Sequence, residues 1–314
     1  MDTKLIVSAS PHVRSEETTQ SLMANVIVAL CPCVVASAII FGMRALLVTA
    51  VSVVACVAFE WLYCKLLKKP NPISDLSAVV TGIILAMNVP VGMPIGQLII
   101  GDLVAIVIVK QLFGGLGYNV ANPAIVARIA LAMGFASRMA NYPHPANGID
   151  ALASATPLAV SGQMGAADYV TLLLGNHGGV LGETCAITLL LGGIYLIATK
   201  VISPVIPVTY LATVAVLSAV SGHDPIVQLL SGGLMLGAFF MATDYVTSPT
   251  TNKGKLVFGI GLGIITCAIR FLGTMNEGVS FAILLMNLLV PYIEILTRQD
   301  RLGIAKAKKE GAAK

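Results

Sequence analysis

The residues best suited to chemistry lie in a run of small side chains, Ser154-Ala155-Thr156-Pro157, with Asp150 six residues before the threonine. A Thr followed by Pro predicts a helix start, because the Thr oxygen can cap a backbone N–H and Pro has no N–H to leave unpaired. The same helix start would offer N–H groups and a positive dipole end to a phosphate at the Thr hydroxyl. Thr156 therefore has two interpretations, a plain helix cap or an anchor for a phosphate-bearing group.

The composition of the chain indicates what kind of structure must position these residues. Hydrophobic residues make up 57% of the chain, charged residues 11%, and the mean hydropathy is +0.90, whereas soluble domains carry about 25% charged residues. We therefore expect an all-α integral membrane protein, with helices that cross an apolar layer about 30 Å thick. Ten apolar segments are candidate spans, of which the third to fifth are short or interrupted: residues 22–41, 45–63, 76–89, 95–113, 123–134, 186–202, 205–220, 227–242, 256–272 and 279–296.

The basic residues predict which way the chain crosses the membrane, because Lys and Arg near span ends stay in the cytoplasm. With ten spans and a cytoplasmic N-terminus, 15 of the 19 basic residues fall inside and three outside, and Arg128 lies within a span. We expect both termini in the cytoplasm and the protein in the inner membrane. The net charge of +4 then favours contact with anionic lipid and not with nucleic acid. The first 21 residues are polar, so we expect the first span to direct insertion.

A run of 61 residues from Met139 to Thr199 contains no Lys or Arg, and we interpret most of it as an extracytoplasmic loop. It separates two halves that resemble each other weakly, since residues 81–88 align with residues 232–239. Five spans per half is an odd number, so the second half must enter from the opposite side, as in many transporters. The predicted organisation is a cytoplasmic segment (1–21), a five-helix repeat (22–140), a loop (141–182), a second five-helix repeat (183–297) and a basic tail (298–314).

A second polar cluster is expected where the fifth span begins. Asn119, Asn122 and Arg128 lie there, and Asp244 and Thr247 follow the eighth span on the same side. A charged residue inside a span is a functional candidate, because it needs a partner or a polar cavity. The alternative for Arg128 is snorkelling to the interface.

Other polar residues have plainer interpretations. Glu60, Asn88 and Asp102 are candidates for ion passage, but each lies near an expected span end, where an interfacial carboxylate or amide needs no special role.

Histidines and cysteines do not form a metal site by themselves. His144, His177 and His223 are too far apart for a compact ligand set, and we expect each to be a solvated loop residue. Cys31 and Cys33 are either buried thiols or ligands shared with a partner subunit.

Four stretches together resemble a known family: DALASATPL (150–158), KKPNPISDLSAVVTGIILAMNVP (68–90), GYNVANPAIVAR (117–128) and MATDYVTSPTTNKGK (241–255). The chain resembles the D subunit of the Rnf ferredoxin:NAD oxidoreductase and the related B subunit of the sodium-translocating NADH:quinone oxidoreductase. The resemblance implies FMN bound by a phosphoester to Thr156, in a motif that keeps Asp150 and Ala155. Ala153 stands where the family has Ser or Thr, and Ser154 where it has Gly.

The resemblance also implies a role in a complex. A second, non-covalent flavin, riboflavin, is implied among the spans, where Asn119, Asn122, Arg128, Asp244 and Thr247 are candidate ligands. The implied partners are the Rnf subunits A, B, C, E and G together with membrane lipid. The chain would be one subunit of a redox-driven Na+ or H+ translocase, inactive alone, with no catalytic residue or metal ligand of its own. No G-x-G-x-x-G motif follows a strand, so we expect a partner to bind NAD. The alternative is a flavin-free channel or permease with an inverted repeat.

Overall fold

A computed structural model describes residues 17–70, 72–142, 166–175, 177–183, 185–273 and 278–298. Within those ranges the regular elements are all helical. Asp150, Ser154, Ala155 and Thr156 lie outside the described residues, so the expectations for them stay predictions.

The first half of the chain contains two long helices followed by shorter ones. Thr18 caps the first helix by accepting a hydrogen bond from the backbone N–H of Ser21, and Gly42, at φ 75°, separates the first helix from the second. Asn122 and Pro123 begin the fifth helix as a cap followed by an N1 proline. The elements are α1 (Thr19–Phe41), α2 (Met43–Leu66), η1 (Ile73–Asp75), α3 (Ser77–Met87), α4 (Ile95–Leu103), which continues as the π-helix η2 (Val104–Gln111), α5 (Pro123–Gly134) and α6 (Ala136–Met139).

The second half also alternates long helices with short ones. Asp224 and Pro225 repeat the cap-and-proline start, here at the beginning of α10. The elements are α7 (Ala166–Leu174), α8 (Ala186–Ala198), α9 (Val205–Val220), α10 (Pro225–Leu230), α11 (Leu234–Leu236), which continues as the π-helix η5 (Gly237–Met241), α12 (Asn252–Leu272) and α13 (Val279–Thr297).

The eighth apolar segment is not one helix. The sequence predicts a continuous span over residues 227–242, but the helix stops after Leu230 and resumes at Leu234. Gly232 and Gly233 lie at φ 72° and 65°, a left-handed conformation that glycine adopts freely and that an α-helix cannot contain. The prediction of a continuous helix was wrong because an apolar profile does not reveal backbone conformation.

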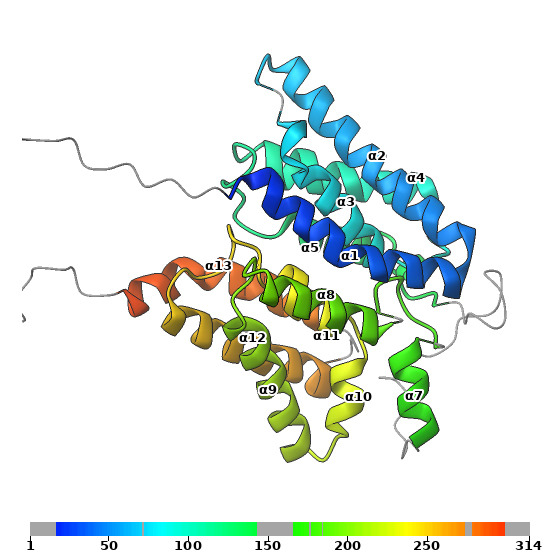
Figure 1. Ribbon diagram of the computed structural model, residues 1–314, viewed down its shortest axis with the longest axis vertical. Helices are drawn as coiled ribbons and strands as arrows, with labels where there is room; N and C mark the ends of the chain where they lie inside the picture. Colours follow the sequence, from blue (N-terminus) through cyan, green and yellow to red (C-terminus); the bar gives the residue numbers. More distant parts are fainter. Residues whose placement is uncertain are drawn as a thin grey trace, which may run out of the picture.

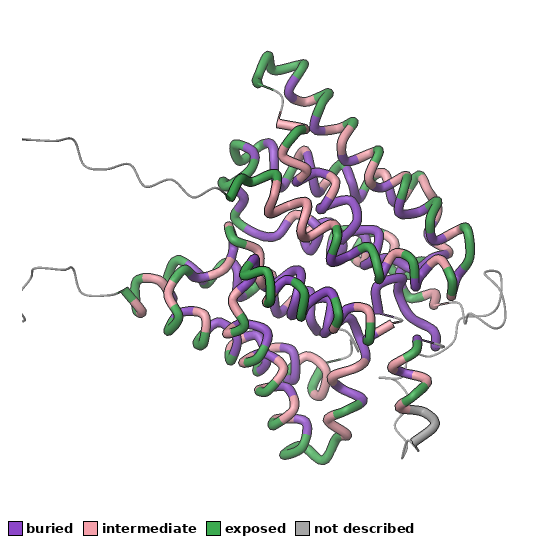
Figure 2. The backbone as a smooth tube through the Cα atoms, in the orientation of Figure 1, coloured by how far each residue is buried: buried purple, intermediate pink, exposed green. Residues whose placement is uncertain are grey.

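The two halves lie side by side, with α1–α5 in the upper part of Figure 1 and α8–α13 in the lower part. They meet where α1 packs on α8 and α5 packs on α13. Buried residues concentrate between the halves (Figure 2). The inverted relation between the halves stays a prediction.

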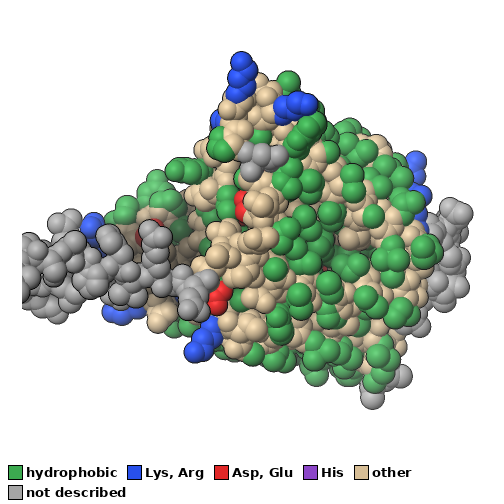
Figure 3. Space-filling model, turned by 45° about the horizontal axis from the view of Figure 1, so that its top comes forward, with side chains coloured by type: hydrophobic (Ala, Val, Ile, Leu, Met, Phe, Trp, Pro, Cys, Tyr) green, Lys and Arg blue, Asp and Glu red, His purple; other side chains and the backbone are tan. Residues whose placement is uncertain are grey.

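The outer surface is suited to lipid. Among the described residues, α1, α2, α12 and α13 are long and apolar enough to cross a membrane. Large hydrophobic side chains are exposed along these helices, and hydrophobic side chains cover much of the face seen in Figure 3. The fold is that of an all-α, multi-pass membrane protein.

Hydrogen bonds show which helix ends share a side. The Tyr195 hydroxyl near the end of α8 donates to Asn25 near the start of α1 at 3.0 Å. Thr251 at the start of α12 lies 3.0 Å from Thr297 at the end of α13, oxygen to oxygen. We call this side, on the left in Figure 1, the terminal face, and the other side the opposite face.

The contact between the halves depends on Gly192 in α8. A Cβ atom built there would lie 2.3 Å from the backbone oxygen of Ala29 in α1, so Gly192→Ala should push α1 and α8 apart. We expect a destabilisation of roughly 1–3 kcal/mol, the usual cost of overpacking, seen as a lower melting temperature in detergent.

Gly96→Ala is the matched control, because its added Cβ would meet nothing within 4 Å. It should leave the melting temperature unchanged or raise it slightly. Equal effects of the two substitutions would contradict the packing of α1 on α8.

Candidate functional site

A pocket opens on the terminal face between the two halves. Asn119, Asn122 and Asp244 line it, as the sequence predicts, and α1 closes one side with Met23 and Val26. The pocket is open to solvent on the terminal face.

Local structure fixes the polar lining of this pocket. Asn122 Oδ1 accepts from the backbone N–H of Ala124 at 3.0 Å, which caps α5, and Asn122 Nδ2 donates to the carbonyl of Met241 at 3.3 Å. Asn122 therefore connects the start of α5 to the end of η5. Asn119 Nδ2 donates to the Ala121 carbonyl at 3.2 Å.

Asp244 supplies the acidic group. Burial raises the pKa of Asp244, and hydrogen bonds from Thr247 and Asn119 oppose that rise. Thr247 Oγ1 donates to Asp244 Oδ2 at 3.1 Å. Thr247 is buried and is absent from the pocket lining, so it supports Asp244 from behind.

The rest of the lining is mainly apolar and partly aromatic. Phe239, Phe240 and Tyr245 contribute from η5 and the segment that follows it. Flat aromatic molecules pack well on such rings, and the amides of Asn119 and Asn122 can bond a polar edge. The pocket suits a planar ring system with hydrogen-bonding atoms at its rim.

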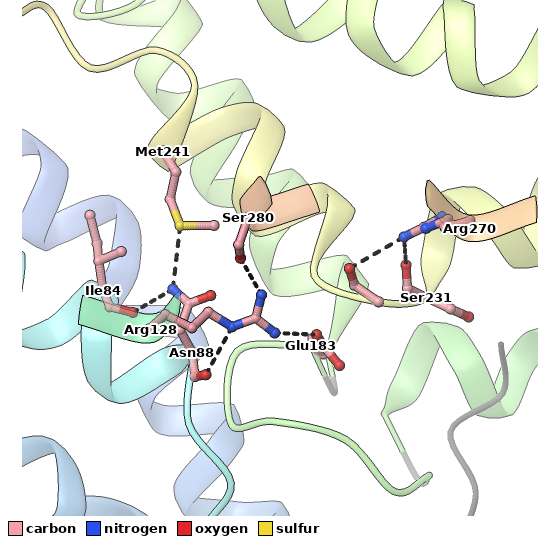
Figure 4. Close-up of polar contacts among 9 residues, drawn as sticks. Ile84, Asn88, Arg128, Glu183, Ser231, Met241, Arg270 and Ser280 are labelled. Carbon is pink, nitrogen blue, oxygen red and sulfur yellow. Dashed lines mark hydrogen bonds and ion pairs between the residues drawn. The ribbon is translucent and has the colours of Figure 1, made fainter. Parts of the chain in front are cut away.

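Arg128 does not join this pocket. Its Nε donates to the Asn88 carbonyl at 3.2 Å, its Nη1 donates to the Ser280 hydroxyl, and its Nη2 lies 3.8 Å from Glu183 Oε1 (Figure 4). Asp244 and Thr247, which the sequence places on the same side as Arg128 and which are its natural partners there, bond to each other instead. Arg128 is buried, so the snorkelling alternative is also excluded.

These contacts explain why Arg128 lies inside the membrane. Asn88 follows the last residue of α3, where carbonyl groups have no helical partner. Such groups are costly to bury in lipid, and the guanidinium satisfies one of them. Arg128 thus connects α3, α5 and α13.

A buried segment reaches the surroundings of Arg128 from the opposite face. The backbone N–H groups of Leu181 and Gly182 donate to the carbonyls of Val89 and Met87 at 3.2 and 2.7 Å, and Glu183 approaches Arg128. We call residues 177–183 the inner strap. His177 lies in it and is buried, so the prediction of a solvated loop histidine was wrong for this residue.

The helix that breaks after Leu230 has a similar arrangement. Arg270 in α12 donates to the carbonyl of Gln228 at 2.7 Å and to that of Ser231 at 2.9 Å, where α10 ends. Figure 4 shows both guanidinium groups turned towards a broken helix. From the sequence, Arg270 counts only as an extracytoplasmic charge, and this contact was not foreseen.

Three polar residues expected at the interface are buried instead. Glu60 and Asp102 have no exposed surface, and Asn88 is 2% exposed. Lys110, which the sequence places among the cytoplasmic charges, is 2% exposed and forms an ion pair with Glu60 at 2.6 Å. Buried polar residues recur every four positions along α2, at Ser52, Cys56 and Glu60, and this spacing is a signal that could have revealed them.

The two cysteines of the first helix face different surroundings. Cys31 is exposed, whereas Cys33 is buried with its Sγ 3.8 Å from Met87 Sδ. Within the described ranges, no group of three potential metal ligands comes together.

Comparison with known proteins places the chain in a family. The NQR2, RnfD, RnfE family matches residues 6–303. The chain is 46% identical to the D subunit of the Na(+)-translocating ferredoxin:NAD(+) oxidoreductase complex of Acetobacterium woodii, over 98% of both chains. It is 39% identical to the D subunit of the proton-translocating ferredoxin:NAD(+) oxidoreductase complex of Clostridium ljungdahlii, over 95% of this chain and 96% of that protein. It is also 33% identical to the D subunit of the ion-translocating oxidoreductase complex of Cronobacter sakazakii, over 93% of this chain and 97% of that protein.

The fold and the site define a polytopic membrane protein with a pocket between two helical halves and buried charges inside the membrane. The chain belongs to the NQR2, RnfD, RnfE family. The resemblance stated from its motifs is thereby confirmed.

The coupling of Arg128 and Glu183 can be tested with a double-mutant cycle. Arg128→Met should destabilise the protein by roughly 3–5 kcal/mol, because it leaves a buried carboxylate without its cation. Adding Glu183→Gln should recover about 0.5–3 kcal/mol of that loss, the range of coupling between contacting residues. The measurement is thermal unfolding in detergent.

Arg138→Met is the control, since Arg138 is exposed at the end of α6, and it should change little. If the effects of Arg128→Met and Glu183→Gln simply add, the two side chains do not act together.

Proposed function

We propose that this chain is the flavin-carrying membrane subunit of an ion-translocating ferredoxin:NAD oxidoreductase. The observation that carries the proposal is similarity over nearly the full length to D subunits that bear this name. The protein's part in such chemistry is to attach and orient the flavin and to tune its surroundings electrostatically.

The first proposed cofactor is FMN, held by a phosphoester to Thr156. The motif from Asp150 to Thr156, with Ser154 and Ala155, supports this site. The segment that follows is anchored on the opposite face, where the Tyr169 hydroxyl of α7 donates to Asp224. That hydrogen bond, together with one from the Ile226 backbone, holds the pKa of Asp224 below its usual range.

The second proposed cofactor is a non-covalent flavin, riboflavin, in the terminal-face pocket. Asn119 and Asn122 would bond the polar edge of its ring system, and Phe239 and Phe240 would contact the ring faces. Asp244, supported by Thr247, would offer a carboxyl group at the wall of the pocket. Arg128 is not part of this proposed set. A bound flavin there supplies the ability to accept and release electrons.

The proposed orientation puts the terminal face in the cytoplasm. Lys65, Lys69, Lys200, Lys253 and Lys255 lie at helix ends on that face, as expected for a cytoplasmic surface of the inner membrane. FMN on Thr156 would then lie on the extracytoplasmic side.

We further propose that the chain works only with the Rnf subunits A, B, C, E and G. The exposed apolar surfaces of α1, α2, α12 and α13 are available to those partners and to lipid. The coupling ion is Na+ or H+, since the names of the relatives include both.

The alternative, a flavin-free channel or permease, is separated from this proposal by one experiment. The purified complex is denatured, run on a gel and viewed under ultraviolet light, where covalently bound flavin stays with the protein band and fluoresces. We expect a fluorescent band in the wild-type protein and none in Thr156→Ala, because alanine has no hydroxyl to form the phosphoester.

Thr171→Ala is the control, since Thr171 lies in α7 shortly after the motif, and its band should keep the fluorescence. A band that survives Thr156→Ala would move the attachment site. A wild-type band without fluorescence would support the flavin-free alternative.

A further inference from the structure

A stripe of polar residues runs along α2 inside the membrane. Ser52, Cys56 and Glu60 are spaced by four residues, so they lie on one side of the helix, and all three are buried. Asp102 at the end of α4 and Lys110 in η2 face this stripe.

The π-helical form of η2 helps both residues to reach α2. In an α-helix, eight residues would turn Lys110 about 80° past Asp102, because each residue turns the chain by about 100°. The wider turn of a π-helix reduces that offset. Such wide turns often occur at functional positions.

The end of the stripe near the terminal face is balanced in charge. Lys110 Nζ lies 2.6 Å from Glu60 Oε1, which also accepts from Gln111 Nε2 at 2.7 Å. Lys110 donates to Ser77 Oγ at 2.5 Å. Glu60 and Lys110 therefore form a buried, hydrogen-bonded ion pair.

Asp102, in contrast, has no cationic partner among the described residues. Its Oδ1 accepts from Ser52 Oγ at 2.6 Å and from Cys56 Sγ at 3.3 Å. Its Oδ2 has no hydrogen-bond partner in the described part of the chain. The side chain has no exposed surface.

The charged groups on the neighbouring helices are engaged elsewhere. On α2 and η2 these are Glu60 and Lys110, which pair with each other. On α5 it is Arg128, which contacts Asn88, Ser280 and Glu183. On the third side, α3 carries no charged residue and presents the Gly82 carbonyl 2.9 Å from Ser52 Oγ, so this carbonyl and Asp102 Oδ1 share the single hydroxyl proton of Ser52.

A bare carboxylate in this position would be very unfavourable, because a buried charge needs a counter-ion or must be neutralised. A hard metal ion would need about six oxygen ligands. Asp102 and Ser52 offer three oxygen atoms, one of them already bonded to Gly82. A proton on Oδ2 neutralises the group and leaves both hydrogen bonds to Oδ1 intact.

Among the described residues, a series of polar side chains leads from this site towards the terminal face. Beyond Cys56, one helical turn leads to Glu60, followed by Lys110, Ser77 and Asp75, whose Oδ1 accepts from Ser77 Oγ at 2.6 Å. Asp75 is partly exposed on the terminal face.

In the other direction the surroundings are mostly apolar, although Gln97 of α4 and Arg44 of α2 also lie on that side. Ala45, Val48 and Leu98 are fully buried there, and the Thr49 hydroxyl donates to the carbonyl of Ala45 in its own helix.

We propose that Asp102 is a proton-binding site inside the membrane, which exchanges its proton with the terminal face along the Glu60, Lys110 and Ser77 side chains. The proposal rests on the proposed function only in that redox-driven ion movement would give this proton a use. Asp102 itself does not line the terminal-face pocket, whereas Lys110 and Ser77 do.

The test uses dicyclohexylcarbodiimide, an apolar reagent that adds to protonated carboxyl groups in membranes and leaves carboxylates unmodified. The intact complex in its native membranes is treated at neutral pH, and its peptides are analysed by mass spectrometry. We expect an adduct on Asp102 that declines as the pH is raised, and none on Glu60, whose carboxylate is paired with Lys110. Asp102→Asn should remove the adduct, and Thr156→Ala should keep it.

Infrared spectroscopy of the purified complex is a second test, which does not require the reagent to reach Asp102. One C=O band of a protonated carboxyl group, distinct from any band that Asp244→Asn removes, should be present in the wild type, lost in Asp102→Asn, kept in Glu60→Gln, and shifted in D2O. An unchanged band in Asp102→Asn would overturn the proposal. Loss of the adduct and the band when sodium replaces potassium would also overturn it, because a sodium ion would then occupy the site.

Discussion

The structure depends on how broken helices are tolerated inside a membrane. A helix that ends in an apolar layer exposes carbonyl groups that neither lipid nor water can satisfy there. Arg128 donates a hydrogen bond to such a carbonyl at the end of α3, and Arg270 does the same at the end of α10. Because a guanidinium satisfies carbonyl groups at each of these helix ends, short helices such as α3 and α5 can pack on each other inside the protein and leave room for buried polar groups.

Arg128 also has a consequence for communication across the molecule. It contacts the end of α3, Ser280 of α13 and Glu183 of the inner strap. The strap lies on the opposite face, and α5 begins at the pocket of the terminal face. One buried side chain therefore connects the inner strap with the helix that begins at this pocket.

Much of this arrangement could be predicted from the sequence. Apolar segment length predicts the spans, and the cap-and-proline start at Asn122 and Pro123 predicts the beginning of α5. The order of the expected spans puts Asn119, Asn122 and Asp244 on the same side of the membrane, and the structure brings them together in one pocket. The partners of Arg128 could not be predicted, because the place where α3 ends inside the protein and the inserted strap are tertiary features. Lys110 was misplaced because a charge near a span end is usually interfacial, and only packing shows that Glu60 faces it.

The central proposal is that this protein carries flavin at two separate places. The flavin in the terminal-face pocket is the part of this proposal that a measurement can most directly refute. Val26 of α1 lines the pocket, whereas Val28, two residues later, is 53% exposed towards lipid. The decisive measurement is the amount of flavin that acid releases from purified complexes carrying Val26→Trp or Val28→Trp. We predict that Val26→Trp loses the releasable flavin and keeps the fluorescent protein band, while Val28→Trp keeps both. Full release from Val26→Trp would contradict a flavin in this pocket.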